Sequence, residues 1–261
     1  MEEDQVVARL RAAGCVFAEE EARLLREAAG TPADLEAMVS QREKGLPLEQ
    51  VVGWADFCGL RIFVDPGVFV PRRRSEFLVA TAVSLASGAS PVIVDLCCGT
   101  GALGLAVAAR LAAAGRAAGL HAADIDPAAG GCARRNVEPA GGRVYQGDLF
   151  APLPAELRGR VTVLICNAPY VPTGDIALLP PEARDYEPRT ALDGGSDGLA
   201  VLRRAAAEAP RWLAPGGVLL VETSDPQAPL MTRVMTAAGL TGRVHRCAEY
   251  ESTVVTGTAP G

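Results

Sequence analysis

Residues 167–170, with the sequence NAPY, have the most distinctive chemistry in this 261-residue chain. The side-chain oxygen of Asn167 and the carbonyl of Ala168 can each accept one N–H of a planar –NH2 group. Pro169 fixes the backbone, and the ring of Tyr170 can cover a planar amide. Such a segment aims a nitrogen at a methyl carbon, which is the orientation that a one-step methyl transfer needs. The alternative interpretation is a simple turn, because Asn-x-Pro sequences favour turns.

A second segment, residues 94–101 with the sequence VDLCCGTG, has the pattern of a ligand-binding turn. A buried strand runs into small residues, Gly99 and Gly101 let a ligand approach the backbone, and the next helix starts with free N–H groups. Gly104 completes the G-x-G-x-x-G pattern of dinucleotide sites, so the glycines alone fit either a dinucleotide or S-adenosylmethionine. Asp95 at the strand end and the G-T-G turn favour S-adenosylmethionine. A tight turn without a ligand is the third interpretation.

Two further carboxylates lie at the expected ends of strands. Asp124 follows Gly101 by 23 residues, where a carboxylate can accept hydrogen bonds from ribose hydroxyls. An acid that starts a helix is the alternative role, but Asp126, directly before Pro127, is the better candidate for that position. Asp148, after the next strand, is placed to accept a hydrogen bond from an adenine amino group.

The chain from residue 91 onward alternates short apolar strands with helices, and this order must position the residues above. Strands are expected near residues 91–95, 120–125, 143–146, 161–166, 217–223, 243–246 and 252–258, and helices near 102–114, 127–137, 198–209 and 229–239. Residues 167–197 are expected to form a long loop. This order predicts an α/β fold, a doubly wound parallel sheet whose last two strands add an antiparallel hairpin. Ligands of such sheets bind at the carboxyl ends of the strands.

The first part of the chain differs in character. Residues 1–45 have helical periodicity, and Thr31 followed by a proline is a good helix start. This piece is expected to be too short for a core of its own. Glycines and prolines punctuate short apolar runs in residues 46–71, as in a small hairpin. The expected division is a small helical domain (1–50), a linker with a short β-hairpin (51–74) and a catalytic α/β domain (75–261).

Composition excludes several classes of protein. The chain has 25 basic and 31 acidic side chains, a net charge of −6, without the basic stripe of a nucleic-acid-binding protein. Seven cysteines without a CxxC pair, and only two histidines, predict no zinc site and no disulfide framework. The acidic start and the longest uncharged stretch, residues 77–94, fit neither a signal peptide nor a membrane span. Reduced thiols then favour the cytoplasm.

Residues 194–198, with the sequence GGSDG, match the G-x-S-x-G pattern of serine hydrolases. Asp225 and His245 follow in the order that a hydrolase triad requires. A nucleophile elbow also needs a buried strand directly before the serine, and residues 187–193 do not form one. We therefore expect Ser196 to have no nucleophilic role.

From about Gly45 to the C-terminus, the chain resembles the protein-(glutamine-N5) methyltransferases that modify peptide chain release factors. The matching segments are GLP (45–47), FVPR (69–72), DLCCGTG (95–101), ADI (123–125), GDLF (147–150), NAPY (167–170), YEPRTAL (186–192) and GGSDGL (194–199). The segment at 186–192 is the most specific to this family. The chain departs from the family pattern at several places: PRRRSE at 71–76 replaces PRPETE, Ala168 replaces a proline, and Cys97 replaces the first glycine of the turn. The helical domain is also shorter than is usual, and EYES at 249–252 lacks the Asn/Asp-Arg typical of that region.

The resemblance implies a Rossmann-like S-adenosylmethionine-dependent methyltransferase fold and a protein substrate, the release factor. It also implies that the N-terminal helices help to recognise this partner. The implied cofactor contacts are Cys97, Cys98, Gly99, Thr100, Gly101, Asp124, Leu149 and Asn167. Asn167, Ala168, Pro169 and Tyr170 would hold the glutamine amide, with Asn167, Pro169 and Tyr170 catalytic.

Three other functions remain open at this stage. An Asn-x-Pro-aromatic segment also suits the exocyclic nitrogen of adenine, so a DNA or RNA methyltransferase is one, although the net charge of −6 disfavours it. A related enzyme that methylates another protein is the second. A non-catalytic Rossmann-type binding module is the third, and the intact NAPY segment argues against it.

Overall fold

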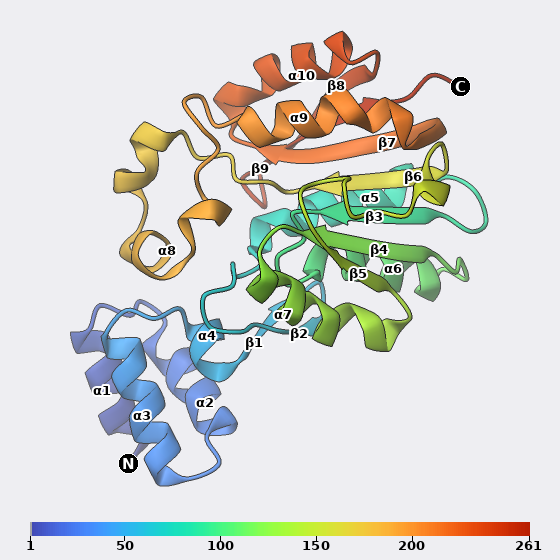
Figure 1. Ribbon diagram of the computed structural model, residues 1–261. Coiled ribbons are helices and arrows are strands. Elements are labelled where there is room, and N and C mark those ends of the chain that lie inside the picture. Colours follow the sequence, from blue (N-terminus) through green and yellow to red (C-terminus); the bar gives the residue numbers. More distant parts are fainter. Residues whose placement is uncertain (1) are drawn as a thin grey trace.

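The computed structural model describes residues 2–261. A small group of helices leads through a two-stranded hairpin into a seven-stranded sheet that carries helices on both faces (Figure 1). No helix in the described part of the chain is both long and apolar enough to cross a membrane.

The N-terminal helices do have a core of their own. They are α1 (Glu3–Ala12), α2 (Ala18–Ala28), α3 (Pro32–Glu43) and the short α4 (Leu48–Val52). One separate cluster of buried side chains joins them: Val6, Leu10, Ala18, Ala22, Leu25, Leu35, Val39 and Val51. The expectation that this piece lacks a core is therefore wrong, because each helix contributes one apolar face and together the four faces enclose a common interior. The start of α3 is as expected, since Thr31 Oγ1 accepts a hydrogen bond from the Asp34 N–H at 3.1 Å.

The predicted hairpin is confirmed. Strands β1 (Trp54–Phe57) and β2 (Leu60–Phe63) pair antiparallel. Asn136, on α7 (Pro127–Val137), fixes the hairpin to the sheet domain: its Oδ1 accepts from the Phe63 N–H at 2.8 Å, and its Nδ2 donates to the Phe63 carbonyl at 2.9 Å. The same Nδ2 lies 2.9 Å from the carbonyl of Thr100, so one amide links the hairpin to the predicted ligand-binding turn.

The central sheet has the strand order β5-β4-β3-β6-β7-β9-β8. Its strands are β3 (Val92–Leu96), β4 (Gly119–Asp124), β5 (Arg143–Gln146), β6 (Val161–Cys166), β7 (Leu213–Thr223), β8 (Thr241–Cys247) and β9 (Ser252–Thr258). The first five are parallel, and β9 lies antiparallel between β7 and β8. This confirms the predicted Rossmann-like fold, including the antiparallel hairpin at its end.

Helices cover both faces of the sheet (Figure 1). The helices that flank it, besides α7, are α5 (Glu76–Leu85), α6 (Ala102–Ala113), α9 (Ala200–Glu208) and α10 (Ala228–Ala237). Ile93 of β3 packs in the cluster that contains α5 and α6, and Val94, the next residue, packs in the cluster that contains α9 and α10. Because side chains alternate across a strand, both faces of β3 are buried, which explains the apolar run that begins it, residues 92–94.

Residues 167–197 are more structured than the long loop expected from the sequence. They contain the 3-10 helix η4 (Thr173–Leu178), the short helix α8 (Pro181–Tyr186) and the 3-10 helix η5 (Arg189–Ala191). Each follows a proline, which presets the backbone for a turn. Such pieces have fewer than two helical turns, so their apolar residues show no periodicity to detect. The segment also contacts the N-terminal helices, since Glu182 lies 3.0 Å from Arg42 of α3.

Candidate functional site

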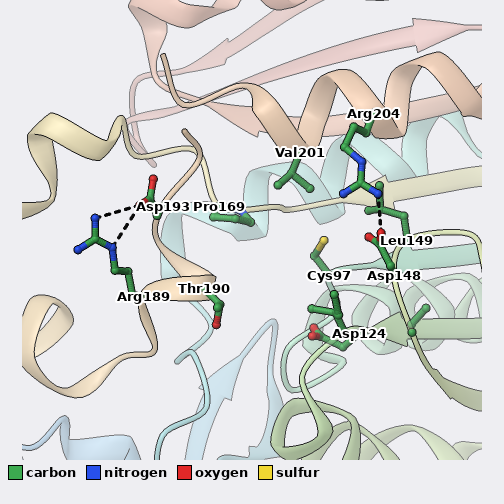
Figure 2. Close-up of a pocket in the computed structure, with 13 residues that line it drawn as sticks. Cys97, Asp124, Asp148, Leu149, Pro169, Arg189, Thr190, Asp193, Val201 and Arg204 are labelled. Carbon is green, nitrogen blue, oxygen red and sulfur yellow. Dashed lines mark hydrogen bonds and ion pairs between the residues drawn. The ribbon is translucent and has the colours of Figure 1, made fainter. Parts of the chain in front are cut away.

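The candidate site lies where the direction of winding changes in the sheet. Strand β3 has β4 on one side and β6 on the other, so loops that follow β3 and β6 diverge and leave a crevice at their carboxyl ends. A cavity of about 470 Å³ lies there (Figure 2). Its walls come from the ends of β3, β4, β5 and β6, from η5 and from α9. They are Cys97, Ala123, Asp124, Ile125, Gly147, Asp148, Leu149, Pro169, Arg189, Thr190, Asp193, Val201 and Arg204.

A smaller cavity of about 70 Å³ adjoins it. The two cavities share Cys97, Asp124, Ile125, Pro169 and Thr190. The smaller one adds Asn167 and Gly99 from the predicted site, and Val68, Phe69, Asp126, Ala129, Pro188 and Ala191. The structure therefore brings the NAPY segment and the glycine turn to one place, as predicted from their position after parallel strands.

Residues 97–101, the cofactor turn, need unusual backbone angles. Cys97, Gly99 and Gly101 have φ values of 53°, 56° and 77°, in the left-handed region that favours glycine. A Cβ on Gly101 would lie 2.6 Å from a methyl of Val137, so this glycine lets the turn pack against α7. Cys98 and Thr100 are buried and line neither cavity. They shape the turn rather than face the crevice.

Cys97 adopts the left-handed conformation without being glycine, and its side chain lies at the cavity (Figure 2). A hydrogen bond with Cys166 and burial raise the pKa of the Cys97 thiol well above its usual value. The thiol is therefore protonated at neutral pH. It acts as a small apolar wall, not as a nucleophile.

Asp124 is held by the turn itself. Its Oδ2 accepts from the Gly99 N–H at 2.8 Å, and its Oδ1 accepts from the Asp126 N–H at 2.9 Å. Burial raises the pKa of Asp124, and both backbone hydrogen bonds oppose that rise. Each carboxylate oxygen retains a second lone pair for a ligand hydroxyl. Asp126, and not Asp124, is the acid that starts the next helix. Its side chain accepts a hydrogen bond from the Ala128 N–H at 2.9 Å and caps the N-terminus of α7.

Asp95 supports the site without reaching it. Its Oδ2 accepts from the Gly104 N–H at 2.8 Å, which ties the end of β3 to the first turn of α6. Burial raises the pKa of Asp95 to about 7, although this hydrogen bond lowers it. A Cβ on Gly104 would lie 2.9 Å from the Cβ of Asp95, so the last glycine of the G-x-G-x-x-G pattern serves packing between helix and strand.

The far end of the larger cavity carries an ion pair that the sequence did not predict. Asp148 Oδ2 lies 2.5 Å from Arg204 Nη2 (Figure 2). Arg204 and Val201 lie three residues apart on α9 and so face the cavity together. This spacing on one helix face is the only feature of the sequence that relates Arg204 to Val201. Leu149 is buried beside them, with a left-handed φ of 48°.

Residues 167–173, the acceptor loop, follow β6. Asn167 and Pro169 line the smaller cavity, whereas Ala168 is buried in the core. Within residues 2–261 no partner is recorded for the Asn167 side chain, so its amide oxygen is available to a ligand. Tyr170 lines neither cavity. Its hydroxyl donates to Glu222 Oε1 at 2.7 Å and accepts from Arg74 Nη2 at 2.8 Å.

Residues 194–198, the glycine loop, lie directly on the acceptor loop. The Gly194 N–H donates to the Val171 carbonyl at 2.8 Å. A Cβ on Gly198 would lie 2.2 Å from the carbonyl oxygen of Tyr170, so only glycine fits there. Gln227 Nε2 donates to that carbonyl at 2.8 Å and to the Asp197 carbonyl at 3.0 Å, and so joins both loops. Sequence reasoning missed Gln227.

The serine hydrolase arrangement is absent from the part of the chain that the structure describes. Asp225 pairs with Arg246 at 2.5 Å, and His245 Nε2 lies 3.0 Å from Thr256 Oγ1. Within the described residues neither forms a hydrogen bond with Ser196, as expected from the missing strand.

Glu187 connects two of the segments that prompted the family resemblance. Its side chain is fully buried; Oε2 lies 2.6 Å from Arg72 Nη2, and Oε1 accepts from the Val70 N–H at 3.2 Å. Segments 69–72 and 187–191 therefore form one wall beside the smaller cavity. No group of His, Cys, Asp and Glu side chains suited to a metal ion occurs within residues 2–261.

Comparison with known proteins agrees with this geometry. Residues 59–178 match the family model described as methyltransferase small domain. The chain is 39% identical over 204 residues to the release factor glutamine methyltransferase of Geobacter sulfurreducens, across 77% of this chain and 69% of that protein. It is 36% identical to the 4-amino-L-phenylalanine/4-methylamino-L-phenylalanine methyltransferase of Streptomyces pristinaespiralis, across 74% and 66% of the two chains. A solved methyltransferase from Pyrococcus furiosus has the same fold, with a TM-score of 0.56 and 17% identity over 78% of this chain and 90% of that one.

The side chains that line the larger cavity suit S-adenosylmethionine, because they include hydrogen-bond acceptors and apolar walls. Asp124 offers paired acceptors for a ribose diol, Asp148 offers an acceptor at the far end, and Leu149 and Val201 provide apolar walls for a flat ring. Asn167 lines the smaller cavity, which adjoins the larger one through shared walls and leaves room for a methyl acceptor. The chain is an S-adenosylmethionine-dependent methyltransferase and belongs to the release factor glutamine methyltransferase family.

Proposed function

We propose that this enzyme transfers the methyl group of S-adenosylmethionine to the side-chain amide nitrogen of a glutamine in a peptide chain release factor. One observation carries the proposal: the amide of Asn167 lines a small cavity that shares its walls with the larger one. The relative from Geobacter sulfurreducens, which is named for this activity, supplies the substrate class.

We assign the cofactor contacts to the residues that line the cavities. Asp124 accepts from the ribose hydroxyls, Asp148 and Leu149 hold the adenine ring, and Cys97 and Gly99 face the portion that bears the methyl group. Cys98, Thr100 and Gly101, which were also expected to touch the cofactor, act through the shape of the turn.

The acceptor loop positions the nucleophile. When bound, S-adenosylmethionine would supply an electrophilic methyl carbon on a positively charged sulfur; transfer to the amide nitrogen would leave S-adenosylhomocysteine, and the nitrogen would lose one proton to water. Asn167 Oδ1 and the Ala168 carbonyl accept the two amide N–H groups and set the tilt of the nitrogen. Pro169 walls the cavity beside them. Tyr170 fixes the end of the loop. The gain in rate comes from orientation, because an amide nitrogen is a weak nucleophile that must meet the carbon in line.

We also propose a division of labour along the chain. Residues 1–50 recognise the protein substrate. Residues 51–74 link these helices to the sheet domain. Residues 75–261 bind the cofactor and carry out the transfer. A core confined to the first helices supports this division. All seven cysteines are free, which supports a reducing cytoplasm as the location.

Two acceptors for an –NH2 group do not by themselves distinguish a glutamine amide from another planar amine. The relative from Streptomyces pristinaespiralis is named as a methyltransferase of 4-amino-L-phenylalanine and 4-methylamino-L-phenylalanine. Adenine in DNA or RNA has a similar group, but the net charge of −6 disfavours a polyanionic substrate.

Methyl transfer to three substrates tests the proposal. Purified enzyme and labelled S-adenosylmethionine are incubated separately with a recombinant release factor, with 4-amino-L-phenylalanine and with an adenine-containing oligonucleotide. We expect a gain of one methyl on the glutamine-containing peptide of the release factor, located by mass spectrometry, and loss of that signal when the glutamine is replaced by glutamate. Transfer only to the small amine or the oligonucleotide would refute the proposal.

A further inference from the structure

Arg74 is part of a polar network behind the acceptor loop that centres on the buried carboxylate of Glu222. Its Nε donates to Glu222 Oε1 at 3.0 Å, and its Nη2 donates to the Tyr170 hydroxyl at 2.8 Å. The Tyr170 hydroxyl donates to the same Glu222 oxygen at 2.7 Å. Ser75 Oγ donates to the other Glu222 oxygen at 2.6 Å. Three distant parts of the chain therefore meet at one carboxylate: the residues just before α5, the acceptor loop after β6 and the end of β7.

Charge makes Arg74 the critical member of this network. The side chain of Glu222 is only 3% exposed, whereas that of Arg74 is 47% exposed. Arg74 is the only cation recorded as an ion-pair partner of Glu222 within residues 2–261. Loss of the guanidinium would leave a buried carboxylate with two hydroxyl donors and no compensating charge, which is strongly unfavourable. The residue is also one of the places where the chain departs from the resembled family, which has glutamate there.

The network determines where Tyr170 lies. Its hydroxyl is held by Arg74 and Glu222, and its carbonyl is held by Gln227 Nε2 at 2.8 Å. Burial raises the pKa of Tyr170, so the phenol keeps the proton that it donates to Glu222. Both ends of this residue are therefore fixed. Pro169 and Asn167, which line the smaller cavity, precede it directly in the chain.

We propose that Arg74 is a positioning residue for methyl transfer. It acts through Tyr170 and Glu222, and it holds the acceptor loop in the conformation in which Asn167 meets the substrate nitrogen. It touches neither cavity, so its effect is on the geometry of the acceptor and not on binding of the cofactor. The expected effect on the methyl-transfer rate rests on the proposed function, whereas the expected effect on hydrogen exchange of the acceptor loop does not.

Four variants test the proposal. Arg74→Gln removes the charge, Arg74→Lys keeps the charge without the planar fork, and Arg74→Gln combined with Glu222→Gln removes both charges. Arg73→Gln is the matched control, because Arg73 is exposed, adjacent, and has no ion pair recorded in the described residues. Each is measured for single-turnover methyl transfer to the release factor, for S-adenosylhomocysteine affinity by calorimetry, and for hydrogen exchange of the peptide that spans residues 167–173.

We expect Arg74→Gln to lower the rate by about tenfold to a hundredfold, the scale of small misalignments, with S-adenosylhomocysteine affinity unchanged. Hydrogen exchange of residues 167–173 should become faster. Arg74→Lys should retain part of the rate, and the double variant should recover part of it, because two neutral amides can still hydrogen-bond the Tyr170 hydroxyl. Arg73→Gln should behave as wild type in all three measurements.

Three results would overturn the proposal. They are a wild-type rate in Arg74→Gln, unchanged exchange of residues 167–173 in that variant, or a loss of cofactor affinity equal to the loss of rate, which would show a general structural defect. If wild-type enzyme does not methylate the release factor, the proposed function fails, and the exchange measurement alone then decides the role of Arg74.

Discussion

Asp124 and Asp126 provide the sharpest test of the cofactor assignment, because two neighbouring carboxylates have different partners. Asp124 accepts from the backbone N–H groups of Gly99 and Asp126 and lines both cavities. Asp126 accepts from the Ala128 N–H and starts α7. We therefore expect Asp124→Ala to weaken cofactor binding and Asp126→Ala to lower the stability of the fold.

The magnitude follows from the hydrogen bonds that each variant removes. A hydrogen bond to a charged group contributes about 1.5–3 kcal/mol, so loss of one ribose contact raises the Kd by about tenfold to a hundredfold. Asp124→Ala also leaves the Gly99 N–H without its acceptor, which loosens the turn and places the effect near the upper end. Asp126→Ala removes a helix cap, at a cost of about 1 kcal/mol in the free energy of unfolding.

Calorimetric titration with S-adenosylhomocysteine, together with urea unfolding, measures both effects. Asp124→Asn serves as an intermediate, because it keeps one acceptor oxygen but turns an NH2 group toward one of two backbone N–H donors. The ribose assignment would be wrong if Asp124→Ala bound with unchanged Kd. It would also be wrong if Asp126→Ala lost as much affinity as Asp124→Ala.

Four further changes have defined outcomes. Asn167→Ala should lower the rate of single-turnover methyl transfer by about a hundredfold, because it removes one oriented hydrogen-bond acceptor, while the midpoint of thermal unfolding changes little. Asn167→Asp should keep part of the activity. Full activity of the alanine variant would exclude Asn167 from the mechanism. Gly198→Ala should lower both activity and stability, measured by thermal unfolding, because its methyl meets the Tyr170 carbonyl at 2.2 Å; a wild-type midpoint would contradict this packing. Ser196→Ala should leave methyl transfer intact, and labelling of Ser196 by a fluorophosphonate would contradict a structural role for the glycine loop. The folded-state pKa of Asp95, about 7, lies above the unfolded value, so the protonated form favours folding and stability should fall as pH rises from about 4 to 7, by at most about 4 kcal/mol. Asp95→Asn should reduce that pH dependence in urea unfolding by the share that Asp95 contributes, while Asp124 and Glu187, whose pKa values burial also raises, keep theirs. An unchanged slope would show that Asp95 is not a source of it.

The strands and helices of the α/β domain were predictable because each depends on neighbours in sequence. The apolar run at 92–94 has both faces buried in β3, and the Asp126-Pro127 start of α7 follows from capping alone. The cofactor turn and the NAPY segment were also predictable, because both are short and each follows a strand. Parallel strands then bring them together at one edge of the sheet.

The residues that brace the site could not be predicted, because their partners are remote in sequence. Arg72 and Glu187 are separated by 115 positions, and Arg74 and Glu222 by 148. Nothing in the local pattern of either member indicates the other. Arg204 and Val201 face the cavity only because α9 lies beside the loop that follows β5, where Arg204 pairs with Asp148, and this placement depends on how the chain folds over the sheet.

The pattern of these remote contacts indicates how the enzyme gains its rate. The acids that line the smaller cavity, Asp124 and Asp126, already accept hydrogen bonds from backbone N–H groups, and the Cys97 thiol is kept protonated. Because we assign Asp124 to the ribose and Asp126 starts α7, none of them is assigned as a general base. The chain instead fixes the acceptor loop from three sides: the glycine loop pairs with its backbone, Gln227 holds the Tyr170 carbonyl, and the network around Glu222 holds the Tyr170 hydroxyl. Methyl transfer from a sulfonium needs alignment more than proton transfer, and the structure places its constraints on the residues that set alignment.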